Sequence, residues 1–140
     1  MVGKFEESAR KTLNSFKQSI PILIGVLLML SLVNTAVPKE FYSKIFTGNK
    51  LVDPFIGALF GSIAAGNPIT SYVIGGELKN QGVSMVAVLA FILSWVTVGV
   101  VQLPAESLML GKKFAIIRNF VSFLMAILIA ILVVLTLGLK

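Results

Sequence analysis

Cysteine and histidine are both absent from the chain. Without them the chain forms no disulfide, ligates no haem and builds none of the usual zinc sites. The same absence removes the side chains that most nucleophilic and acid–base mechanisms need. A G-x-x-x-x-G-K-[ST] phosphate-binding loop is missing as well. We therefore expect a protein that is not an enzyme, holds no cofactor or metal, and does not use ATP.

Charge is also scarce. Only 13% of the 140 residues are charged and 56% are apolar, whereas soluble domains carry about 25% charged residues. Each of the four uncharged runs, 18–38, 54–76, 80–105 and 119–139, reaches the ~18 residues that a spanning helix requires. The sequence predicts an all-α integral membrane protein that crosses the lipid bilayer several times, in the cytoplasmic membrane of a prokaryote.

The few basic residues give a net charge of +6, and almost all of them flank the apolar runs. This placement fits lipid headgroups better than a stripe that follows nucleic-acid phosphates. We expect no nucleic-acid partner.

The apolar runs divide the single domain, 1–140, into segments. Residues 1–19 show apolar side chains every three or four positions, which predicts an amphipathic helix at the membrane interface; the alternative is an extension of the first span into water. Three continuous transmembrane helices and one broken or re-entrant segment are expected to follow. The four membrane segments are 20–37, 54–79 (broken), 83–103 and 114–139.

The break is predicted at residues 61–72, GSIAAGNPITSY. Asp53-Pro54 is a helix-start signal, an acceptor followed by proline, and Asn67-Pro68 repeats that signal fourteen residues later. We expect two half-helices, 54–65 and 68–79, which either cross the bilayer together or turn back as a hairpin.

Non-helical backbone at membrane depth is tolerated only inside protein or beside a wet cavity, and many transporters bind substrate at such breaks. The sequence therefore predicts a solute pathway at the break; the alternative is a kink whose polar groups satisfy one another. A row of small residues on the first half-helix is expected to pack against another helix. The predicted pathway residues are Gly66, Asn67, Pro68, Thr70, Ser71 and Glu106, and the packing row is Gly57, Gly61 and Ala65.

The sequence allows two positions for the side chain of Glu106 relative to the membrane. A third helix that continues past Pro104 would place this carboxylate at membrane depth, where an ionisable group is costly and usually functional. A helix that stops at residue 103 would leave it at the interface. Arg118 either pairs with Glu106 or extends to the headgroups.

Residues 66–91, GNPITSYVIGGELKNQGVSMVAVLAF, together with Pro104-Ala105-Glu106, resemble the predicted-permease family that includes the organoarsenical efflux permeases. The shared features are a proline followed by small polar residues, a glycine-containing turn at 81–83, and Ala90-Phe91. Members are about twice as long, are built from two related halves and carry cysteines beside the proline, where this chain has residues 69–72. The resemblance implies a permease scaffold, a homodimer or higher oligomer of half-size subunits, and pathway roles for Asn67, Pro68, Thr70, Ser71 and Glu106.

Taken together, these patterns predict a membrane permease that moves a small solute through a site at the broken helix. A passive channel and a non-transporting membrane scaffold are the alternatives. The basic residues divide almost evenly between the two sides of the predicted membrane, so two copies inserted in opposite orientations would form an antiparallel homodimer with an inverted repeat.

Overall fold

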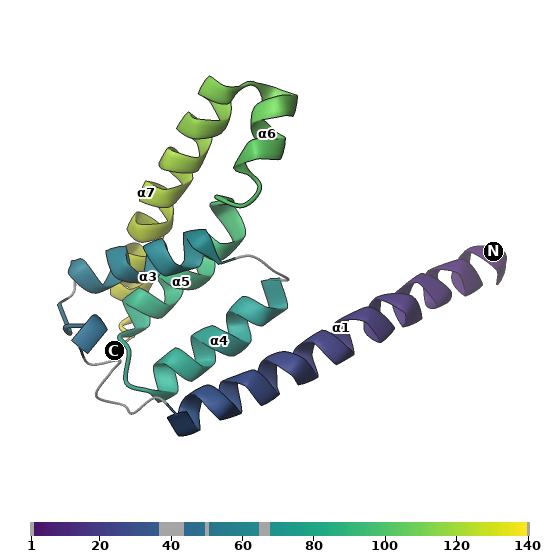
Figure 1. Cartoon of the computed structure of the whole chain (residues 1–140), viewed down its shortest axis with the longest axis horizontal. Helices are drawn as coiled ribbons and strands as arrows, with labels where there is room; N and C mark the ends of the chain where they lie inside the picture. The colour runs from purple at the N-terminus through teal and green to yellow at the C-terminus, as the bar shows by residue number, and fades with distance from the viewer. Residues whose placement is uncertain (1, 37–43, 50, 65–67, 140) are drawn as a thin grey trace. The chain divides into compact units, whose positions relative to one another are not determined.

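The computed structural model describes residues 2–36, 44–49, 51–64 and 68–139, and it contains helices and no strand in those ranges. This confirms the all-α prediction. The chain divides into two compact units, Met1–Val37 and Pro38–Lys140. The helices, in the labels of Figure 1, are α1 (Val2–Ala36), α3 (Val52–Ile63), α4 (Pro68–Asn80), α5 (Met85–Thr97), α6 (Leu103–Leu110) and α7 (Lys112–Leu137).

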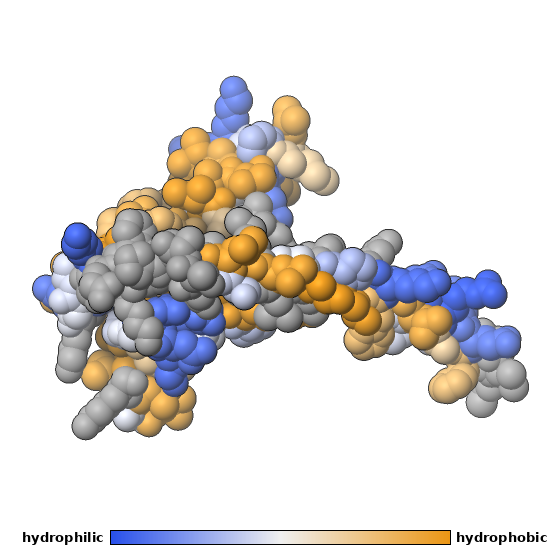
Figure 2. Space-filling view, turned by 60° about the horizontal axis from the view of Figure 1, so that its bottom comes forward, coloured by the Kyte–Doolittle hydropathy of each residue, from blue (hydrophilic) through white to orange (hydrophobic). Residues whose placement is uncertain are grey.

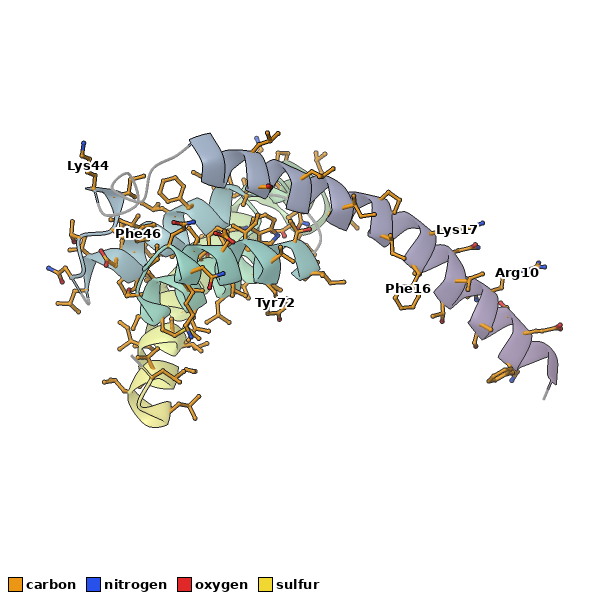
Figure 3. The ribbon with its side chains drawn as sticks, turned by 90° about the horizontal axis from the view of Figure 1, so that it is seen from below. Arg10, Phe16, Lys17, Lys44, Phe46 and Tyr72 are labelled. Atoms are coloured by element: carbon orange, nitrogen blue, oxygen red, sulfur yellow. The ribbon has the colours of Figure 1, made fainter. Side chains whose placement is uncertain are left out.

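The first unit consists of α1, one helix that continues through Pro21. The boundary predicted between 1–19 and 20–37 is therefore not a break in the helix. Its N-terminal part is amphipathic: hydrophilic and hydrophobic side chains occupy opposite edges in Figure 2. In Figure 3, Arg10 and Lys17 point to one side of the helix and Phe16 to the other.

In the second unit, α3 and α5 lie parallel and very close together. A Cβ atom placed on Gly57 would fall on the carbonyl oxygen of Ala87, and one placed on Gly61 would fall on the carbonyl oxygen of Phe91. Both contacts advance by four residues in the same direction, which makes the pair parallel. The buried core beside them consists of small residues, namely Ala58, Ala90 and Ala130 on α3, α5 and α7.

After α3 the chain turns back, so that α3 and α4 run in opposite directions (Figure 1). Pro68, which begins α4, lines one cavity together with residues from the end of α5. The other end of α4 leads directly into α5 through the turn at residues 81–84. Helices α3 and α4 are therefore antiparallel. Ala65, Gly66 and Asn67 lie outside the described residues.

Gly82 ends α4 in a Schellman motif, as the sequence indicates. Its φ is +89°, and the N–H groups of Gly82 and Val83 donate to the carbonyls of Lys79 and Leu78, both at 3.0 Å. This left-handed conformation favours glycine, and the two hydrogen bonds satisfy carbonyls at the end of the helix.

The start of α3 differs from the prediction. The helix begins at Val52 with Leu51 as its N-cap, and Asp53 lies in the first turn. The Asp53 carboxylate points back to the preceding loop, where it accepts the N–H groups of Thr47 at 2.8 Å and Gly48 at 2.9 Å. The N–H groups of the exposed loop residues Thr47 and Gly48 thus pair with Asp53, whose buried carboxylate, on a residue 1% exposed, is satisfied by them.

The third membrane segment, predicted as one helix over 83–103, is broken. Helix α5 ends at Thr97, residues 98–102 are irregular, and α6 begins at Leu103. The β-branched residues on both sides of Gly99 weaken the helix there. Pro104 occupies the first turn of α6, where a proline costs no hydrogen bond, so it starts a helix and does not kink one.

Helix α7 (Lys112–Leu137) corresponds to the segment predicted at 114–139. By length and composition it is the one helix, among the described residues, that can cross a membrane; α3 and α5 are shorter apolar helices. Ile131 and Val134, near the end of α7, lie beside the start of α5, and Asn119, near the start of α7, contacts the residues that follow α5. The path α5, break, α6 therefore runs antiparallel to α7.

Candidate functional site

Two helix breaks face each other in the second unit. The N–H of Val100, in the second break, donates to the carbonyl of Ser62, at the end of α3, over 3.4 Å. Ala64 and Pro68, on the two sides of the hairpin turn, line a cavity of about 220 Å³ together with Gly99 and Gln102. The end of α3, the start of α4 and the α5–α6 break thus form one site.

Four helix ends converge on this site. Helices α3 and α5 end there in extended residues, Ala64 and Val98, whose N–H groups donate to Phe60 and Ser94. Helices α4 and α6 begin there. Helix C-termini present carbonyls with partial negative charge and N-termini present N–H groups with partial positive charge. The site therefore offers both kinds of hydrogen-bonding group to a polar solute.

The predicted pathway residues are distributed unevenly around this cavity. Pro68 lines it, whereas Thr70 and Ser71 are buried in the first turn of α4 and are not among its lining residues. The Ser71 hydroxyl donates to the Pro68 carbonyl at 2.6 Å, so it satisfies its own helix. Gly66 and Asn67 precede α4 and lie outside the described residues. Tyr72 is 61% exposed and extends outward from α4 (Figure 3).

Glu106 stands beside the second break and helps to fix it. Its carboxylate accepts hydrogen bonds from Nε and Nη2 of Arg118, and from Nδ2 of Asn119 at 3.0 Å. Asn119 in turn accepts the N–H of Gly99 at 2.8 Å. The ion pair links α6 to α7, and the Asn119 amide replaces the helical acceptor that Gly99 lacks. Glu106 acts on the site through Asn119 and does not line the cavity.

Sequence reasoning overlooked the second half of the site. Trp95, Gly99 and Gln102 line the cavity, and Asn119 is a buried amide in an otherwise apolar helix. Gly99 and Gln102 lie in a run of valines shortly before Pro104, and a glycine and a polar residue so placed are themselves a signal for a break. Because the end of the third segment was predicted from Pro104, it was placed at residue 103, six residues beyond the end of α5 at Thr97.

The chain matches no known protein-family model, no characterised protein and no solved structure. The function is therefore inferred from the geometry of the two breaks.

Proposed function

We propose that the chain is a multi-pass membrane protein in which α7 crosses the bilayer. The 26 residues of α7 span about 39 Å at 1.5 Å per residue, against a hydrocarbon core of about 30 Å. Large apolar side chains are exposed along the helix, among them Phe120, Leu124, Leu128 and Leu132, each about half exposed or more. Lipid accommodates such a surface, and Lys112 and Lys113 at the first turn suit headgroups.

The second break then lies inside the hydrocarbon region. Asn119, which binds Gly99, is seven residues from the start of α7, or about 10 Å along it. With α7 centred in the membrane, the break is about 6 Å below the hydrocarbon boundary. Irregular backbone at that depth must be buried in protein or line a cavity, because an unpaired peptide group facing lipid costs several kcal/mol.

We infer that the chain is a permease for a small polar solute, because the two helix breaks lie together at one cavity. The observation that carries this proposal is the cavity between the end of α3, the start of α4 and the α5–α6 break, with four helix ends directed at it. Discontinuous helices of this kind are how many transporters bind solute near the membrane midplane. A cavity of about 220 Å³ is smaller than the ~300–1,000 Å³ typical of drug-sized ligands, which favours a small solute.

The site also favours a homo-oligomer. Gln102 and Pro68 are exposed, and Val101 and Ile69 are 61% and 47% exposed. In the membrane, the Gln102 amide and the backbone of both helix breaks would then face lipid. A second copy that covers this face, in the same or the opposite orientation, completes the enclosure of the site.

Transport is tested with purified protein in liposomes, by iso-osmotic swelling in a panel of small neutral, anionic and cationic solutes. We expect at least one solute to enter at a rate that saturates with its concentration. The Gln102→Leu variant should slow this entry by about tenfold, the effect of one lost hydrogen bond to a solute in a site of low dielectric. Thr136→Val, which also removes an exposed polar group but at the far end of α7, serves as the control.

Three outcomes contradict the proposal. Entry no faster than in protein-free liposomes would refute transport, and entry that never saturates would identify a passive channel. Equal rates for Gln102→Leu and Thr136→Val would remove the cavity from the pathway. Because the chain has no cysteine, the oligomer face is tested separately: Val101→Cys should form disulfide-linked dimers in the membrane, and Leu128→Cys on α7 should not.

A further inference from the structure

A second pair of cavities lies at the opposite end of the hairpin. A polar cavity of about 250 Å³ is formed by the loop before α3 and the α4–α5 turn, and Thr47, Gly48 and Asp53 line it. An apolar groove of about 570 Å³ lies between the start of α5 and the last turns of α7, against Val86 and Val134. Gly48 and Ser84 line both. The two cavities therefore adjoin, and together they form a site with one polar end and one apolar end.

The polar end contains a buried negative charge. The Asp53 carboxylate is 1% exposed and accepts three hydrogen bonds, from the N–H and the hydroxyl of Thr47 and from the N–H of Gly48. A carboxylate has about four acceptor positions, two on each oxygen. Thr47 occupies both positions on Oδ1 and Gly48 occupies one on Oδ2, so one position remains on Oδ2. Within the described part of the chain, no lysine or arginine forms an ion pair with Asp53. A cationic donor would compensate this buried charge.

Two exposed lysines are close in sequence to residues that line the polar cavity. Lys44 is two residues before Phe46, and Lys79 is two residues before Gln81; both lysines are exposed, while Phe46 and Gln81 line the polar cavity. Figure 3 shows Lys44 extending away from the protein on the segment that carries Phe46. The two lysines therefore lie on segments that contribute to the cavity, but they are not among its lining residues.

The apolar end follows α7 into the membrane. Ile131, Val134 and Leu135 line the groove on α7, and Ile131 lies about 10 Å along the helix from Gly138. The polar cavity is at the end of α7 and the groove leads inward from it. This is the arrangement of a phospholipid, whose headgroup lies at the interface and whose acyl chain lies in the hydrocarbon region.

We propose that this composite cavity binds an aminophospholipid of the phosphatidylethanolamine class. Its primary ammonium donates to Asp53, and one acyl chain occupies the groove between α5 and α7. A choline headgroup carries no N–H donor and does not satisfy Asp53. The inference rests on the membrane position of α7 in the proposed function, but it does not depend on transport.

Native mass spectrometry of the detergent-solubilised protein tests this site. Phosphatidylethanolamine, phosphatidylcholine and phosphatidylglycerol with identical acyl chains are added in competition. We expect the wild type to retain phosphatidylethanolamine about tenfold more than either rival, the effect of roughly one charge-assisted hydrogen bond. Asp53→Asn should bring the ratio to phosphatidylcholine close to one. Glu6→Gln, which removes an exposed acid on α1 that lines neither cavity, should leave the ratio unchanged.

A second variant keeps the test independent of Asp53, whose loss also removes loop hydrogen bonds. Val134→Trp fills the groove and should reduce retention of all three lipids while circular dichroism shows an intact fold. Equal retention of the three lipids by the wild type would overturn the proposal. So would a preference for phosphatidylglycerol, or a preference for phosphatidylethanolamine that survives in Asp53→Asn. None of these measurements involves solute entry, so a failure here is distinct from a failure of transport.

Discussion

Helices α3 and α5 approach each other so closely that a methyl group added at Gly61 should destabilise the protein. The added Cβ would fall on the carbonyl oxygen of Phe91 and lie 2.6 Å from Oγ of Ser94. Helices α3 and α5 would have to separate by roughly 1 Å to restore ordinary van der Waals contact. That movement also stretches the buried 2.6 Å hydrogen bond from the Ser94 hydroxyl to the Ala58 carbonyl.

The magnitude follows from three terms. Overpacking costs about 1–3 kcal/mol, and a weakened buried hydrogen bond costs about 1 kcal/mol. The higher helix propensity of alanine stabilises the helix by up to about 1 kcal/mol relative to glycine. Gly76→Ala on α4 is the matched control, because its Cβ has no heavy atom within 4 Å and it gains the same propensity. The two variants should therefore differ in unfolding free energy by about 2–4 kcal/mol.

Denaturation in mixed detergent micelles measures this difference. The chain has one tryptophan, Trp95, which lies on α5 one turn after Phe91, with the two rings 5.5 Å apart, so its fluorescence reports on the unfolding of α5. Gly61→Ala should unfold at lower denaturant than the wild type, and Gly76→Ala at the same or higher denaturant. Equal midpoints for the two variants would refute the close approach of α3 and α5.

The same assay tests two further positions. Asn119→Leu should lower the free energy of unfolding by about 2–3 kcal/mol, because the N–H of Gly99 loses its acceptor and Glu106 loses a donor. Leu124→Ala, which truncates a side chain that is 48% exposed, is the control. A loss for Asn119→Leu no larger than that of the control would exclude the bridging role of Asn119. Gly82→Ala should cost about 1–2 kcal/mol, since its φ of +89° is strained for alanine, and a midpoint equal to that of Gly76→Ala would contradict the Schellman geometry.

The sequence predicted the helical class and the first break, because both depend on local signals. Uncharged runs mark apolar helices, and Asn67-Pro68 marks the start of α4 whatever surrounds it. The direction of α4 after the break depends instead on which partner buries it. Gly75 packs against Ile92 of α5, and nothing local to the break encodes that contact.

The position of the second break also depends on a contact that is distant in the sequence. Residues 96–101 are uncharged and continue the apolar run of α5 in the sequence, which predicts a continuous helix. The acceptor for the N–H of Gly99 comes from Asn119, twenty residues further along the chain. Asp53 is a similar case: its local sequence signal predicts an N-cap, but its carboxylate accepts the N–H groups of Thr47 and Gly48 in the preceding loop. Tertiary hydrogen bonds decided both cases. Gly99 and Gln102 give a local signal for the second break, but the sequence does not show the contact with Asn119 that fixes its position.

The pairing of α7 with the interrupted path of α5 and α6 has a consequence for biogenesis. Helices α3, α5 and α6 have 12, 13 and 8 residues, too short to enter the bilayer alone as spanning segments. The helix that covers them is synthesised after all of them. In the proposed membrane protein, the short helices leave the ribosome before their partner exists, so they must wait at the insertion machinery and enter the bilayer together with α7.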